Sequence, residues 1–315
     1  VRQAEFSKGD WTKAWLPVHA RVYAPRNMHY LPSVDLKKYL QLQRNEDMGF
    51  VAKATWADVS IDLPMNPWMK HLRGHEAIAE LSFESPSRIG AFHVLAKQFQ
   101  RMARYTRACG LAGVAGNPVD WGDKYNENPP TRGFQDEKHW RLSLLNFDVF
   151  EAVMNDPDVD LTEVIERALK KRYGVSLPKP LAQYIIESQD ITSGIVNIRG
   201  IRADGSTLES MYYSLLRYGP TVKNWTARLS RSPANLRRIF REKDLVMARA
   251  EYILADIKTY RGKIPAKAYE EFVSCFTELR DRSAFCNQQK LNFLLWALKD
   301  RTLPCDIHTI HQLED

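Results

Sequence analysis

Apolar and polar residues alternate along two short runs in the first part of the chain, WADVSID and IAELSFES. Successive side chains of a β-strand point to opposite faces, so this alternation predicts two strands with one apolar face each. The polar face carries carboxylates, namely Asp58 and Asp62 in the first run and Glu80 and Glu84 in the second. Adjacent strands with carboxylates on one side are typical of the wall of a glycosidase or metal site, although a sheet with one solvated face has the same pattern.

Strand-like and helix-like runs alternate over roughly residues 1–175. The strand-like runs are Trp15–Tyr23, Gly49–Asp58, Ala77–Glu84 and Gly110–Gly116. The helix-like runs are Asp35–Gln43, Ser87–Arg107, Glu137–Met154 and Leu161–Tyr173. This alternation predicts a parallel sheet, and small or polar residues at the carboxyl ends of strands are typical of the active face of a (β/α)8 barrel. Because only four strands are predicted, we expect residues 1–175 to form the second half of a (β/α)8 TIM-type barrel, with the first half upstream of Val1.

The pattern becomes helical after about residue 176. Helices are predicted over Ser206–Arg217, Pro233–Phe240, Asp244–Tyr260, Pro265–Asp281 and Gln288–Lys299. In the fourth of these, Phe272, Cys275, Phe276 and Leu279 recur at the spacing of one helix face. We therefore expect residues 176–315 to form an all-α C-terminal domain.

Composition narrows the classes of protein without choosing one. Of the 315 residues, 44% are hydrophobic and 26% charged, as in ordinary globular proteins. The net charge of +7 favours acidic partners, which include uronic-acid sugars, nucleic acids and anionic membranes. No apolar run could span a membrane, the four cysteines form no zinc or disulfide pattern, and no nucleotide or zinc-protease motif is present. Since the sequence begins at Val1 without a methionine or signal peptide, we expect a piece of a longer or processed protein, whose targeting is left open.

Several segments, taken in order, resemble the second half of the barrel of glycoside hydrolase family 67, the α-glucuronidases. They read HARVYAPRN, DLKKYLQL, FVAKATWADVSIDLPMNPW, GHEAIAELSFES, GLAGVAG and NFDVFEAVMNDPDVDLTEVIERALKKRYG, over roughly residues 1–175. Each segment is short, and their order and spacing carry the resemblance. The helical region beyond them is compatible with the same family. The resemblance implies a barrel that hydrolyses glycosides of uronic acids.

The resemblance also implies catalytic roles. Asp58 and Glu84 correspond to two candidates for the catalytic base, and Glu80 matches an earlier glutamate of the same strand. The general acid of the family lies on the fourth strand of the barrel, which would be upstream of Val1. The runs after Asp58 (IDLP) and at Glu84 (ESP) depart from the family's charge pattern, which puts the sugar specificity in question.

Basic residues on the predicted strands are candidates for binding the carboxylate of an acidic sugar. His19 and Arg21 share one face of the first strand, and Lys53 precedes Asp58 by five residues, as the resemblance requires. The other candidates for substrate contact are Trp56, Asp62 and the loop residues Asp120 and Trp121. Trp56, like Trp68, could stack on a sugar ring, whereas core packing is the commoner use of tryptophan.

Each of these assignments has a structural alternative. Asp58 can cap a loop, and Glu84 can stabilise the N-terminus of the following helix. Burying the charge of Lys53 inside an apolar strand costs free energy unless an opposite charge pairs with it. Asp58 can supply that charge without any substrate. The basic residues of the first strand can likewise form a pair across strands.

These observations lead to three hypotheses for function. The first is a glycoside hydrolase that acts on acidic, uronic-acid-containing sugars by carboxylate acid/base hydrolysis, without a metal or another cofactor. The alternative is a catalytically degenerate carbohydrate-binding protein, which the altered runs after Asp58 and Glu84 favour. The third is a basic interaction module built on Arg217–Lys243, a stretch that a solvated helix face or an oligomer contact also explains. The expected partners are an oligosaccharide or polysaccharide and the missing half of the barrel, from the same or a second chain. No membrane partner is expected. A homodimer is left open.

Overall fold

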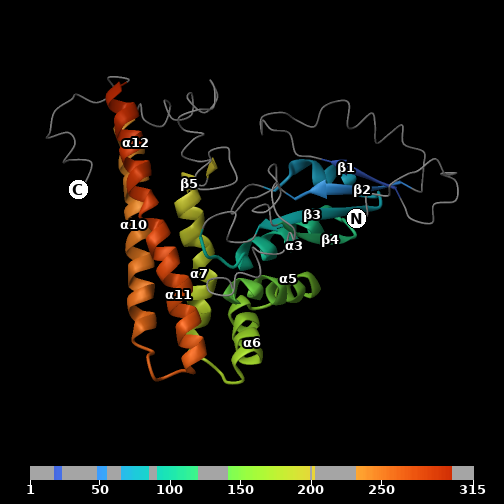
Figure 1. Cartoon of the computed structure of the whole chain (residues 1–315). Coiled ribbons are helices and arrows are strands. Elements are labelled where there is room, and N and C mark those ends of the chain that lie inside the picture. Colours follow the sequence, from blue (N-terminus) through green and yellow to red (C-terminus); the bar gives the residue numbers. More distant parts are fainter. Residues whose placement is uncertain are drawn as a thin grey trace, which may run out of the picture.

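A computed structural model of the chain has a small parallel sheet beside a bundle of long helices (Figure 1). The structure describes residues 18–22, 48–54, 65–84, 91–119, 141–198, 201–202 and 232–299. The helices predicted over Asp35–Gln43 and Ser206–Arg217 lie outside these residues. The fold is therefore mixed α/β in its first part and mostly helical in its C-terminal part.

Four strands form one sheet in which every neighbouring pair is parallel. In order across the sheet they are β1 (Val18–Val22), β2 (Met48–Lys53), β3 (Ala77–Glu84) and β4 (Gly113–Val119). The predicted parallel sheet is confirmed, and the predicted bounds of β3 agree residue for residue. β1 and β4 are the open edges, and no closed barrel is present among the described residues.

Helix α3 (Ala96–Cys109) lies in the connection from β3 to β4. The predicted helix began too early, because Ala91–Leu95 is not helical. The backbone of this segment is bonded to side chains of other helices, and the N–H of Val94 donates to Ser188 Oγ at 3.0 Å. At the other end, Gly110 has a φ of 72°, a left-handed conformation that suits glycine, so β4 begins later than predicted.

Helix α6 (Leu161–Tyr173) has the predicted bounds. Asp160 Oδ1 accepts the backbone N–H groups of Thr162 at 2.7 Å and Glu163 at 3.3 Å, which satisfies two donors that the helix cannot pair itself. Gly174 ends the helix with a φ of 76°. Both ends of α6 are therefore specified by residues next to it in sequence.

The other predicted helices are present where the structure describes them, with different bounds. They are η3 (a 3-10 helix, Arg141–Leu144), α5 (Leu145–Asn155), α10 (Pro233–Lys258), α11 (Ala266–Ser283) and α12 (Phe285–Lys299). The helix predicted over Glu137–Met154 is, where described, the 3-10 turn η3 followed by α5. The two helices predicted over Pro233–Phe240 and Asp244–Tyr260 are one continuous helix, α10. The residues between them, REK, are good helix formers, and no glycine or proline interrupts the run.

Four of the described elements were not predicted from the sequence. They are the 3-10 helix η2 (Pro67–Leu72), α7 (Lys179–Val196) and the two strands of a short antiparallel hairpin, β5 (Asn197–Ile198) and β6 (Ile201–Arg202). Helix α7 packs against α3, α6, α10 and α11 and so joins the two parts of the structure. The polar residues Ser188, Gln189 and Thr192 are buried on α7 and interrupt its apolar stripe. Their polarity obscured the helical pattern.

Two apolar clusters hold these elements together. The smaller cluster includes Phe50, Ala52, Ala77 and Ala79 from one face of the sheet, packed against α3 and the 3-10 helix η2 (Pro67–Leu72). The larger cluster runs from α3 through α5, α6 and α7 to α10, α11 and α12, and therefore crosses the boundary predicted at residue 175. None of the described helices has the length and apolarity needed to cross a membrane.

Candidate functional site

The sheet has one apolar face and one face with charged residues. In the strand register, Lys53 at the end of β2 is opposite Glu80 on β3, and Glu80 is opposite Ala115 on β4. Residues at the same register position of neighbouring parallel strands belong to the same face. The other face is the one that carries Phe50 and Ala52 and packs on η2 and α3. The charged positions therefore lie on the face that these two helices leave uncovered.

Glu80 is the central residue of this face. It is a buried carboxylate, with 9% of its surface exposed. Among the described Asp, Glu, Lys and Arg residues, Lys243 is the only other one that is buried. Burying a carboxylate costs several kcal/mol unless polar or charged groups compensate it. A buried glutamate in the middle of a strand is thus a sign of a polar interior rather than of a solvated sheet face.

Small residues lie beside Glu80 on β4. Gly113 and Ala115 are two residues apart and occupy the same face as Glu80 and Ile78, their partners in the register. A Cβ atom added at Gly113 would meet no atom within 4 Å among the described residues. Among the described residues, free space therefore lies above Gly113, two register positions away from the buried carboxylate.

The carboxyl ends of the strands add two more candidates. Lys53 is the last residue of β2 and Glu84 the last residue of β3. Glu84 is four residues beyond Glu80, so β3 extends about 13 Å past the level where β2 ends. In open α/β sheets, ligands bind outside the carboxyl ends of the strands. The predicted catalytic residue Asp58 follows β2 by five residues and lies outside the described part of the chain.

Strand β1 contributes the two remaining basic candidates. Arg21 is opposite Val51 in the register. Val51 lies two positions before Lys53, so Arg21 and, two residues earlier, His19 belong to the same face as Glu80. The sheet thus gathers His19, Arg21, Lys53 and Glu80 on one face. The other predicted site residues, which lie outside the described part of the chain, are Trp56, Asp58, Asp62, Asp120 and Trp121.

Trp68 lies on the opposite side of the sheet. It is partly buried against the smaller apolar cluster, which includes Phe50. Asn66 Oδ1 accepts the backbone N–H of Trp68 at 3.0 Å and so caps η2. Core packing, the structural alternative for this tryptophan, is therefore confirmed.

Sequence patterns did not single out the side chains that hold the connection from β3 to α3. Asn146 Oδ1 accepts the N–H of Leu95 at 2.7 Å, and its Nδ2 donates to the carbonyl of His93 at 3.2 Å. Thr192 Oγ1 donates to the carbonyl of Phe92 at 2.8 Å. These bonds hold the segment that leads into α3, whose N-cap residue Leu95 makes no side-chain cap bond. The only signal in the sequence is the polarity of residues that helix periodicity would place in the core.

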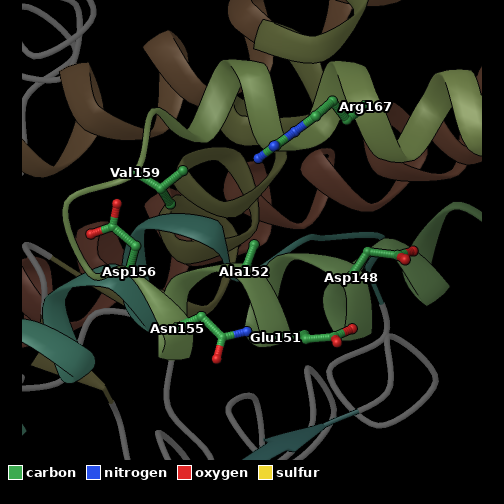
Figure 2. A pocket seen from close by; sticks show the side chains of 7 residues that line it. All are labelled: Asp148, Glu151, Ala152, Asn155, Asp156, Val159 and Arg167. Carbon is green, nitrogen blue, oxygen red and sulfur yellow. The ribbon is translucent and has the colours of Figure 1, made fainter.

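A concave region lies between α5 and α6 (Figure 2). Its volume is about 460 Å³. The lining residues are Asp148, Glu151, Ala152, Asn155, Asp156, Val159 and Arg167. Asp148 accepts from Lys171 at 3.2 Å, and Asp156 accepts the backbone N–H of Asp158 at 3.0 Å, so two of its carboxylates already have partners. We interpret this region as a polar groove between two helices.

Metal and thiol chemistry find no support in the described residues. No group of three or more His, Cys, Asp or Glu residues in this part of the chain could hold a metal ion. Cys109, Cys275 and Cys286 are free and buried. Burial raises the pKa of Cys286 to about 11, which leaves the thiol protonated and a poor nucleophile at neutral pH.

Comparison with known proteins assigns no family. No protein-family model matches the chain, and no curated protein matches it significantly. The function must therefore be argued from the residues and their arrangement alone.

Proposed function

We propose that this protein is a glycoside hydrolase that acts on acidic, uronic-acid-containing sugars. In this proposal the four-stranded sheet is the second half of a (β/α)8 barrel, and the face that carries Glu80 is the interior of that barrel. The helical part after residue 175 supports the barrel from one side. The other half of the barrel comes from the same or a second chain.

The observation that carries the proposal is the register of Lys53 and Glu80. Glu80 is a buried carboxylate, and Lys53 is opposite it on the neighbouring strand. Both positions belong to the face of the sheet that η2 and α3 do not cover. The residue opposite Glu80 on β4 is the small Ala115, and Gly113 lies two positions before it. A carboxylate that donates or accepts protons and a cation that binds a sugar carboxylate are the groups this chemistry needs.

The proposed reaction adds water across a glycosidic bond. One carboxyl group donates a proton to the leaving oxygen as the bond from that oxygen to the anomeric carbon breaks. A second carboxylate supports the attack at the anomeric carbon, and water supplies the hydroxyl that remains there. Asp58 and Glu84 are the candidates for the second carboxylate, and Glu80 is a further candidate. The carboxylate of the uronic acid would be bound by Lys53, Arg21 and His19.

The test is an activity screen of the full-length product against oligosaccharides capped with uronic acids. Asp58→Ala and Glu80→Gln should each lower the release of uronic acid by at least about 100-fold, while Glu151→Gln, which changes an exposed carboxylate on α5, should leave it unchanged. Release that persists in Asp58→Ala and Glu80→Gln would refute the assigned carboxylates. No release from the parent protein would refute hydrolysis.

The altered runs IDLP and ESP support a second candidate, a carbohydrate-binding protein that has lost part of its catalytic set. Isothermal titration with the same oligosaccharides separates the two. Binding without release, weakened when Lys53 is replaced by Met, would favour the binding protein.

A further inference from the structure

The outer face of α10 presents apolar residues to solvent. Leu245 and Tyr252 are 60% and 56% exposed, the largest values among the exposed large hydrophobic residues of the described chain. They lie seven residues apart, which is two turns of the same helix face. Ala248 and Ala255, also exposed, continue this face. We call these four residues the α10 seam.

The α10 seam has the spacing of a coiled-coil contact. Its residues follow one another at intervals of three, four and three, the pattern that keeps one stripe of a helix against a partner helix. The opposite face of α10 is already used, because Ala250, Ile253 and Ile257 are buried in the core of the bundle. Within the described part of the chain, the core is therefore built on the other face of α10, and the seam remains exposed to solvent.

We propose that the α10 seam is the contact for a second copy of this chain, with the two α10 helices antiparallel. Large and small residues alternate along the seam, and antiparallel pairing centred on residue 250 matches them. Leu245 then faces Ala255 of the second copy, and Tyr252 faces Ala248 of the second copy. A parallel arrangement would instead place Leu245 against Leu245 and Tyr252 against Tyr252, without this match in size.

The charges beside the seam are compatible with this pairing. Arg249 is bonded through both its Nε and one Nη to the carboxylate of Glu187 on α7, at 2.6 and 2.8 Å. Glu251 pairs with Arg280 of α11 at 3.5 Å. The like charges that the two-fold axis brings together are therefore already neutralised within each chain. The Asp244 carboxylate beside the seam is likewise already paired within the chain, with Lys290 of α12.

Tyr252 is held in place before any contact forms. The guanidinium of Arg249 lies over its ring, 4.8 Å from the ring centroid. The same guanidinium is anchored by Glu187, so the ring has a fixed support on one side. A side chain that is already ordered loses less conformational entropy when a partner covers it.

Sedimentation velocity of the full chain over a range of concentrations tests the proposal, with Leu245→Glu and Tyr252→Glu as variants. The wild type should form a dimer, and either variant should weaken self-association by roughly 100-fold or more, because it buries an unpaired charge in the contact. Phe147→Glu is the matched control, because it changes a residue that is 41% exposed on α5, away from the seam. Circular dichroism verifies that the variants fold. A wild type that is monomeric throughout, or a dimer unaffected by the two seam variants, would overturn the proposal.

Disulfide trapping tests the orientation. In a Cys305→Ser background, a mixture of chains that carry Leu245→Cys and chains that carry Ala255→Cys should crosslink rapidly, whereas chains with Leu245→Cys alone should not. Antiparallel pairing separates the two copies of residue 245 by ten residues along the helices, about 15 Å. Efficient crosslinking of Leu245→Cys with itself would contradict the antiparallel arrangement.

Discussion

Glu278 on α11 provides a quantitative test of the helical core. Its carboxyl group is mostly buried, and its Oε2 atom has no hydrogen-bond partner among the described residues. Burial raises the pKa of this carboxyl from 4.5 to about 7; nearby Arg282 opposes the increase and Asp281 adds to it. The ionised form of Glu278 is therefore destabilised in the folded protein at physiological pH.

Other ionisable groups near Glu278 lie on the same helix face and on α6. Cys275 is buried one turn away, and the same desolvation raises its pKa, with the charge of Glu278 as a further cause. Glu271, two turns away, accepts from Arg172 Nε at 3.2 Å and from Tyr173 Oη at 2.6 Å. The Arg172 guanidinium of α6 is thus engaged by Glu271.

The sign of the pH dependence follows from the direction of the shift. The unfolded chain loses this proton near pH 4.5, whereas the folded protein keeps it until about pH 7. Between these values the free energy of unfolding falls as pH rises, by about 1.4 kcal/mol per pH unit at most. The stability that Glu278 contributes is present below its unfolded pKa and is lost as pH rises through its folded pKa. The total change is on the order of 3 kcal/mol.

Urea denaturation of the wild type and Glu278→Gln at several pH values between 5 and 8 measures this effect. Glutamine does not titrate, so the variant should gain stability relative to the wild type as pH rises, by roughly 2 to 3 kcal/mol across this range. Glu270→Gln, at an exposed position on the same helix, is the control and should change the pH dependence little. If the curves of the wild type and Glu278→Gln stay parallel from pH 5 to 8, the reasoning is refuted.

Two further predictions concern the packing of α7 and the start of α3. A Cβ atom at Gly194 would overlap Val246 Cγ2 of α10, so Gly194→Ala should lower the free energy of unfolding by about 1 to 3 kcal/mol. Val246→Ala in the same chain should recover part of this loss. If urea denaturation shows no loss of stability in Gly194→Ala, the close approach of the two helices is contradicted. Asn146→Ala should cost about 1 to 3 kcal/mol, because it leaves the buried N–H of Leu95 and the carbonyl of His93 without their partner. Thermal unfolding monitored by circular dichroism measures this second loss, and an unchanged midpoint would show that other groups hold the connection.

Elements with strong local signals could be predicted from the sequence. The alternation in AIAELSFE predicted the bounds of β3, and the helical run Leu161–Tyr173 predicted those of α6, whose ends are capped by Asp160 and Gly174. In these cases the residues that decide the structure are close to one another in sequence, through strand periodicity and helix capping. Elements whose polar groups form hydrogen bonds with distant segments were either not predicted or predicted with the wrong bounds. Helix α7 and the late start of α3 are the two cases, since Ser188 bonds to the backbone of Val94 across 94 residues of chain.

The candidate site divides in the same way. Alternation along each single strand placed Glu80 and Glu84 on one face of their strand and His19 and Arg21 on one face of theirs, because the side-chain period of a strand is two. Only the tertiary structure decided that Lys53 is opposite Glu80, that this face is the one η2 and α3 leave uncovered, and that Glu80 is buried. Register and burial depend on which strands pair and which helices cover them, and those are contacts between residues far apart in the chain. The sequence by itself determined the periods, the caps and the chemical groups available; the packing of separate segments decided where those groups meet.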